Sequence, residues 1–176
     1  MTSLSDIQVL VIDDNAQMRL LVRSLLRAGG ISKVCEASSA EEAFAMMQAH
    51  LFDLVILDWK MSPTDGLALA RMLRWRDDSP NPFIPIIMLT AHTEASKVAA
   101  ARDAGVNGFV KKPISARLLY DRVSSALTDT RHFIRSAEFR GPDRRRGPDA
   151  NYAGPFRRAT DGGVETIDVD DLKLRA

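Results

Sequence analysis

Short runs of apolar residues recur along the first part of the chain, and each is long enough for one strand. Residues 9–12, 54–57 and 84–89 read VLVI, LVIL and IPIIML, and two weaker runs cover residues 33–37 and 108–111. The three strong runs are continuous rather than alternating, which is typical of strands that are covered on both faces. We therefore predict a sheet buried between two layers.

Between these runs, apolar residues recur three or four positions apart, which is the spacing of an amphipathic helix. Gly29 and Gly30 end the first such stretch, Ser39 with Glu42 starts the second as a capping box, and Ser115 can cap the last. Five units of strand followed by helix, joined by right-handed crossovers, predict an α/β fold with a doubly wound five-stranded parallel sheet.

A change in composition near residue 130 indicates a domain boundary. After Thr130 the apolar periodicity stops, and Gly, Pro and Arg dominate in the sequence FRGPDRRRGPDANYAGPFRRATDGG. Residues 1–130 carry a net charge of −1, residues 131–160 a net charge of +5 and residues 161–176 a net charge of −3. We predict a domain over residues 1–130 and, over residues 131–176, a mostly irregular extension that forms no domain of its own.

The composition indicates the class of protein and its cellular compartment. The 176 residues are 45% hydrophobic and 27% charged, as in ordinary globular proteins, and the formal net charge is only +1. The lone cysteine, Cys35, cannot form an internal disulfide, which favours a reducing compartment. No apolar run is long enough to cross a membrane, and residues 1–8 do not read as a signal peptide. We expect a cytoplasmic protein without a membrane partner.

Polar residues follow the predicted strands directly. Asp13 and Asp14 follow the first strand, Asp58 the third, Thr90 the fourth and Lys112 the fifth. Each aspartate alone would be read as a helix N-cap, but caps require neither a doubled aspartate nor a lysine on a neighbouring strand end. The carboxyl ends of parallel strands meet at one edge, where ligands bind. Three carboxylates there repel one another unless they share protons or a cation, and oxygen ligands favour Mg²⁺.

The segments VLVIDDN (9–15), LVILDWKMSPTDG (54–66), IIMLTA (86–91) and GFVKKP (108–113) together resemble the receiver domain of bacterial two-component response regulators. The resemblance covers about residues 6–130 and implies the flavodoxin-like receiver fold. It also implies that Asp58 accepts a phosphoryl group from a histidine kinase or a histidine phosphotransfer protein. Asp14 would bind Mg²⁺ directly and Asp13 would orient it, while Asp58 and the backbone carbonyl of Lys60 would complete the protein ligands.

The resemblance assigns further roles around the acceptor. Lys112 would pair with the phosphoryl oxygens, and Thr90 would donate its hydroxyl to the same group. Phe109 occupies the position of the family's switch aromatic, although a plain core residue is an equal alternative. Lys60 and His92 occupy the positions that flank the path of the hydrolytic water, so we expect them to set a long lifetime of the phosphorylated state.

The extension and the site leave more than one function in view. The 46 residues after Thr130 are too few for a helix-turn-helix output domain. Either this segment is a solvated tail, or residues 132–160, with Phe133, Phe139 and Phe156, dock on a protein surface, this chain's own or a partner's. We expect residues 1–131 to fold without it. The acidic end of the chain argues against a nucleic-acid partner.

We favour a single-domain, chemotaxis-receiver-like signalling protein, not an enzyme, that acts on a downstream target protein. The alternative is a phosphorelay intermediate or a phosphate sink. A phosphatase of the haloacid dehalogenase type would need an acid where Lys60 stands, and a nucleotide-binding module would need a Gly-rich loop after the first strand. Whether phosphorylation causes dimerisation is left open by the sequence.

Overall fold

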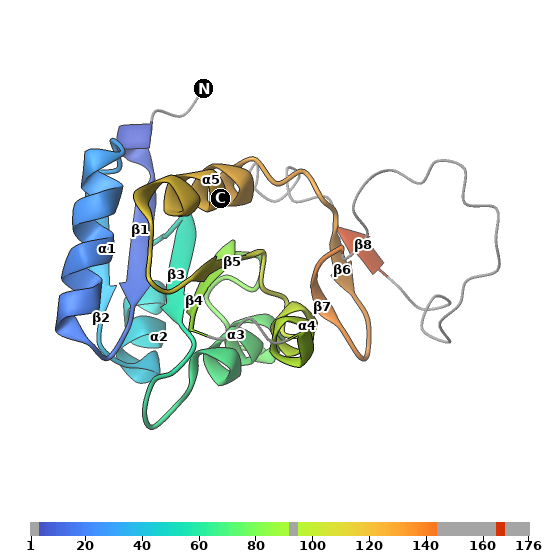
Figure 1. Cartoon of the computed structure of the whole chain (residues 1–176). Helices are drawn as coiled ribbons and strands as arrows, with labels where there is room; N and C mark the ends of the chain where they lie inside the picture. The colour runs from blue at the N-terminus through green and yellow to red at the C-terminus, as the bar shows by residue number, and fades with distance from the viewer. Residues whose placement is uncertain (1–3, 92–94, 144–164, 168–176) are drawn as a thin grey trace.

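The computed structural model describes residues 4–91, 95–143 and 165–167, and its centre is a five-stranded parallel sheet (Figure 1). The strand order is β2-β1-β3-β4-β5, with every neighbouring pair parallel. The strands are β1 (Gln8–Ile12), β2 (Lys33–Ala37), β3 (Leu54–Asp58), β4 (Ile86–Thr90) and β5 (Gly108–Lys111). The order reverses beside β1, and the predicted doubly wound, flavodoxin-like fold is confirmed.

Five α-helices cover the two faces of this sheet, and a short 3₁₀ helix, η1 (Leu4–Asp6), precedes β1 (Figure 1). The helices are α1 (Ala16–Ala28), α2 (Ala40–Ala49), α3 (Gly66–Trp75), α4 (Ala95–Asp103) and α5 (Ala116–Leu127). On one face, Val22 of α1 and Leu119 of α5 pack in the same cluster as Val11, while α2, α3 and α4 cover the other face. No helix within the described ranges is long and apolar enough to cross a membrane.

The continuous apolar runs arise because the central strands are covered on both faces. All residues of β3 and β4 are buried, so neither strand has a polar side to alternate with the apolar one. β4 begins at Ile86, two residues after the start of the predicted run. Pro85 lacks an N–H for the ladder, and the carbonyl of Ile84 accepts a hydrogen bond from Arg74 Nη2 at 2.7 Å.

The helix boundaries follow the caps read from the sequence. The Ser39 side chain accepts from the Glu42 N–H at 3.1 Å, and Ser115 accepts from the Leu118 N–H at 3.2 Å. The Glu42 carboxylate accepts from the N–H of Ser38 rather than that of Ser39, so the capping box is shifted by one residue. Gly29 ends α1, as predicted.

Part of the C-terminal extension forms a second, antiparallel sheet in the order β7-β6-β8. Its strands are β6 (Phe133–Arg135), β7 (Arg140–Pro142) and β8 (Glu165–Ile167), and β6 and β7 lie beside α4 in Figure 1. The sequence pattern does not predict these strands, because three residues are too few to show a periodicity. The docking predicted for this segment takes place, for β6 and β7, on the chain's own surface. Phe156 lies outside the described residues.

Contacts with aromatic rings hold the extension against the domain. Phe133 is buried and meets Phe83 edge to face, with ring centroids 4.8 Å apart. The Arg140 guanidinium lies over the Trp75 ring, 4.7 Å from its centroid. The extension therefore packs at the end of α3 and at the amino-terminal edge of β4 and β5.

Candidate phosphoacceptor and metal site

The opposite, carboxyl-terminal edge of the sheet carries the polar residues singled out in the sequence. Asp13 follows β1, Asp58 is the last residue of β3, Thr90 is the last residue of β4, and Lys112 follows β5. The strand register places Leu57 beside Ile12, Asp58 beside Leu89, and Thr90 beside Lys111. The sheet thus places these functional groups side by side at a single edge.

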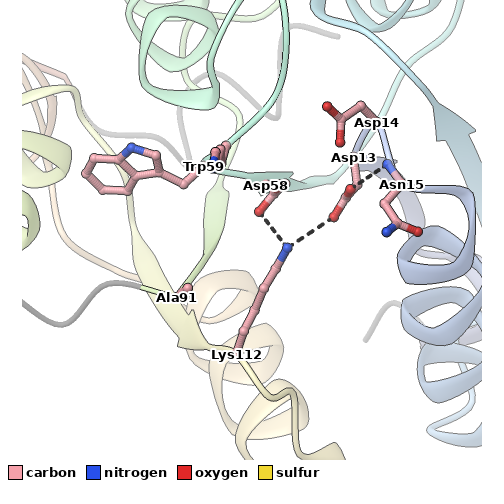
Figure 2. A pocket seen from close by; sticks show the side chains of 8 residues that line it. Asp13, Asp14, Asn15, Asp58, Trp59, Ala91 and Lys112 are labelled. Carbon is pink, nitrogen blue, oxygen red and sulfur yellow. Dashed lines mark hydrogen bonds and ion pairs between the residues drawn. The ribbon is translucent and has the colours of Figure 1, made fainter.

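The lysine joins two of the acids directly. Lys112 Nζ lies 2.8 Å from Asp58 Oδ1 and 3.4 Å from Asp13 Oδ2, and Figure 2 shows its side chain reaching between the two carboxylates. Asp13 Oδ1 also accepts from the Asn15 N–H at 2.8 Å. Both carboxylates are thereby held in fixed orientations, with Asp14 next to them at the start of the turn into α1.

Burial and charge act against each other in this cluster. Asp13 is 1% exposed, and this burial raises the pKa of its carboxyl, with the charge of Asp58 adding to the rise. The Asn15 hydrogen bond and the Lys112 charge oppose it only in part. Burial alone would lower the pKa of Lys112, but the hydrogen bond to Asp58 and the charges of both acids outweigh it and raise that pKa. Lys112 therefore stays protonated at neutral pH.

Position 66, which packs against the backbone of Asp58, has no room for a side chain. A Cβ built on Gly66, the first residue of α3, would lie 2.0 Å from the Asp58 carbonyl oxygen. The Gly66 N–H donates to the Trp59 carbonyl, and the Trp59 N–H donates to the Leu89 carbonyl, both at 2.9 Å. These bonds connect the end of β3 to α3 and β4, which fixes where the Asp58 side chain leaves the sheet.

The acidic residues border an open cavity of about 250 Å³. Its lining is Asp13, Asp14, Asn15, Asp58, Trp59, Lys60, Ala91 and Lys112. One carboxylate oxygen from each of the three aspartates lies within 4.8 Å of the other two, so together they could hold a metal ion. Such hard oxygen donors, with one exposed acid and open space for water, suit Mg²⁺. The Lys112 ammonium bonds to two of the three acids, so within the described part of the chain the lining has more acids than ammonium groups bonded to them.

The remaining predicted residues are distributed as follows. Thr90 is buried at the end of β4, and Lys60 is exposed at the cavity. Phe109 is partly buried and packs against the core on the α2–α4 face, a position compatible with both roles considered for it. His92 lies outside the described residues. Ser62 and Pro63, in the turn after β3, lie outside the set that lines the cavity.

Sequence reasoning missed Asn15, Trp59 and Arg19. Asn15 caps α1 through hydrogen bonds from the Gln17 and Met18 N–H groups, and an Asn directly before a helical pattern is a cap signal that could have identified it. Trp59 follows Asp58 directly and lines the cavity. Arg19 contacts the site through the backbone of Asp13, which leaves no signature in the sequence.

The sequence is similar to a known family and to several known proteins. Residues 9–124 match the model of the response regulator receiver domain. The chemotaxis protein CheY of Pseudomonas aeruginosa is 33% identical over 116 residues, which make up 66% of this chain and 92% of that protein. CheY-3 of Vibrio cholerae is 32% identical over 118 residues, 67% of this chain and 89% of that protein.

The fold agrees as well. The structure of Vibrio cholerae CheY4 matches with a TM-score of 0.64 at 30% identity and covers 69% of this chain and 98% of its own. A probable response regulator with a GGDEF domain matches with a TM-score of 0.63 at 34% identity, covering 70% of this chain and 50% of its own. The family match ends within α5, at residue 124, and leaves out the extension.

Proposed function

This chain belongs to the response regulator receiver domain family, and on that premise we propose that Asp58 accepts a phosphoryl group in a Mg²⁺-dependent reaction. The donor is a histidine kinase or a histidine phosphotransfer protein, and the output is an interaction with a downstream target protein. The observation that carries the proposal is the 2.8 Å ion pair between Lys112 and Asp58 beside two further carboxylates. We place the reaction in the cytoplasm, where the exposed Cys35 stays reduced.

The chemistry asks little of the protein beyond position and charge. A carboxylate oxygen of Asp58 attacks phosphorus; the bond to the donor's imidazole nitrogen breaks as the acyl phosphate bond forms. Lys112 releases part of its contact with Asp58 and pairs with the phosphoryl oxygens, and Thr90 donates its hydroxyl to the same group. Asp13, Asp14, Asp58 and the Lys60 carbonyl would hold Mg²⁺, which neutralises charge on the incoming oxygens when bound. The protein is thus a signalling module rather than an enzyme with a separate substrate.

A direct test uses a small phosphodonor. Incubated with acetyl phosphate and Mg²⁺, the protein should gain the mass of one phosphoryl group, and hydroxylamine should remove it. Asp58→Asn should abolish the adduct because it removes the nucleophile, and Asp14→Ala should strongly reduce it. The matched control is Asp77→Asn, an exposed acid after α3, which should label like the wild type. Undiminished labelling of Asp58→Asn would defeat the assignment.

The lifetime of the phosphorylated state is a separate prediction. We propose that Lys60 and His92 hinder the in-line water, so changing both to smaller polar residues should speed hydrolysis of the acyl phosphate with little effect on uptake. Decay of the radiolabelled protein measures the rate. An unchanged half-life in the double variant would remove both residues from the mechanism.

The alternative is a phosphorelay intermediate or sink that returns its phosphoryl group to a histidine phosphotransfer protein. Transfer assays in both directions separate the two: fast back-transfer from the labelled protein favours the relay, whereas forward transfer alone favours an output through a target protein. Gel filtration with and without acetyl phosphate tests for phosphorylation-dependent dimerisation.

A further inference from the structure

Arg19 of α1 contacts the β1–α1 turn, which carries Asp13 and Asp14. Its Nη1 donates to the backbone carbonyl of Asp13 at 2.7 Å. Its Nε donates to Glu36 Oε2 on β2 at 3.2 Å, and the other oxygen of Glu36 lies 2.6 Å from Arg23 Nη1. One arginine therefore joins α1, β2 and the β1–α1 turn, and a second arginine holds the shared carboxylate from the other side.

The Asp13 carbonyl that accepts from Arg19 lies between the two neighbouring acids. It belongs to the peptide group between Asp13 and Asp14, so its orientation determines how both side chains leave the backbone. The Asp13 N–H donates to the Ala37 carbonyl at 3.2 Å, which fixes the other side of the same residue. With Arg19 bonded, both peptide groups that flank Asp13 are anchored to neighbouring elements.

We infer that Arg19 is a positioning residue, which fixes the peptide between Asp13 and Asp14 and so presents both carboxylates for binding a divalent cation. The metal part of the inference rests on the proposed function. Glu36 keeps the Arg19 guanidinium in place. The Arg19 side chain is 16% exposed, and without this ion pair it would be free to turn toward solvent. A charge-assisted hydrogen bond to a backbone carbonyl is stronger than a neutral one. Because most of the Arg19 side chain is buried, water competes little for this bond.

The inference can be tested by whether replacing Arg19 weakens or strengthens the binding of Mg²⁺. Positioning by Arg19 and simple charge repulsion predict opposite changes in this affinity. Arg19 is a cation close to an acidic cluster, so removing its charge should strengthen the binding of Mg²⁺ if charge is all that it contributes. If instead Arg19 orients the ligands, removing its donors should weaken the binding of Mg²⁺.

The central comparison is Arg19→Met against Arg23→Met. Both variants keep the aliphatic stem, remove one positive charge and take one partner from Glu36, but only the first loses the bond to the Asp13 carbonyl. Mg²⁺ titrations can be read from the fluorescence of Trp59, which lines the cavity, with Trp75→Phe in all proteins to remove the other tryptophan.

We expect Arg19→Met to weaken Mg²⁺ binding about three- to tenfold. This is at or below the lower end of the effects of residues that orient metal ligands without binding the metal themselves. Arg23→Met should bind within about twofold of the parent or more tightly, since charge alone acts there. Arg19→Lys, whose ammonium can still donate to the Asp13 carbonyl, should recover part of the affinity. Parent-like or tighter binding by Arg19→Met would overturn the inference.

A second readout needs no metal. The Asn15 N–H donates to Asp13 Oδ1, so its exchange with solvent reports whether the turn keeps its shape. Exchange measured by NMR in metal-free buffer should accelerate in Arg19→Met and stay unchanged in Arg23→Met. If the parent protein bound no Mg²⁺, the proposed function would fail, while this exchange comparison would still decide the role of Arg19. Should Arg19→Met not fold, Arg19→Gln against Arg23→Gln, in which a neutral polar side chain replaces each arginine, gives the same comparison.

Discussion

Asp13 shows at the residue scale how the site works against the stability of the fold. Its carboxyl is buried next to Asp58, and its pKa in the folded protein is raised above the ordinary value of 3.8. A raised carboxyl pKa favours folding only while the group is protonated, so this contribution is lost as pH rises from 3.8 through the folded pKa. At neutral pH without a divalent cation, Asp13 therefore contributes less to the stability of the folded state than it does at low pH.

We accordingly expect Asp13→Asn to raise the Tm by a few degrees in metal-free buffer at pH 7, with the gain disappearing as pH falls below about 4, where the wild-type carboxyl is protonated as well. Thermal unfolding followed by circular dichroism across this pH range measures it. Asp14→Asn, at the exposed neighbour, is the control and should change Tm less. A lower Tm for Asp13→Asn at pH 7 would mean that the bonds to Lys112 and Asn15 outweigh burial.

Gly66 shows how backbone contact limits the site. Gly66→Ala would place a methyl group against the Asp58 carbonyl, so the start of α3 or the end of β3 must move. We expect a loss of at least about 2 kcal/mol in the free energy of unfolding, as for other overpacked positions, and slower labelling by acetyl phosphate. Gly108→Ala is the matched control, because its added Cβ would meet only Arg122 Cδ at 3.8 Å. Equal stability and labelling of the two variants would contradict this account.

At the scale of elements, the end of α3 joins the domain to its extension through a buried arginine. Arg74 is fully buried and donates to the carbonyls of Pro82 and Ile84 at 2.7 Å each, and to that of Gly105 at 3.0 Å. Burial lowers its pKa to about 9, which still leaves the guanidinium charged at neutral pH. Phe133 of β6 covers it, with the guanidinium carbon 5.4 Å from the ring centroid.

Phe133→Ala should therefore reduce the free energy of unfolding by about 3–5 kcal/mol, the usual range for a buried phenylalanine, because it removes packing and admits water to a buried charge. Urea denaturation measures the change. The neighbouring Ile134, which is only partly buried on the same strand, provides the control, and Ile134→Ala should have a smaller effect. A change below about 1 kcal/mol for Phe133→Ala would show that the extension is dispensable for the fold.

The same contacts revise our expectation that residues 1–131 fold unaided. A chain ending at Arg131 keeps the five-stranded sheet but loses the ring over Arg74, and we now expect it to fold with reduced stability. The boundary near residue 130 stays a prediction that this truncation tests. A polar network crosses it, since Arg131 pairs with Asp129, and Asn107 Nδ2 donates to Asp129 at 3.2 Å. These bonds lower the pKa of Asp129 despite its burial.

At the scale of the whole molecule, the sequence predicts best what is periodic or locally repeated. The five strands and helices follow from apolar spacing, and the cluster of Asp13, Asp58 and Lys112 follows from the rule that parallel strands end at one edge. The structure adds what depends on backbone carbonyls and long-range packing. Arg19 and Arg74 both donate to carbonyls, which every residue possesses, so no residue type in the sequence identifies their acceptors.

The position of Phe133 also has a consequence for the order in which the chain acquires its structure on the ribosome. All carbonyl acceptors of Arg74 belong to residues synthesised before β6, so the guanidinium can find its hydrogen bonds while it is still in contact with water. Its aromatic cover emerges from the exit tunnel only after α5 is complete. We therefore expect Arg74 to stay hydrated in the nascent domain until β6 packs over it, and water to leave the amino-terminal edge of the sheet only at that stage.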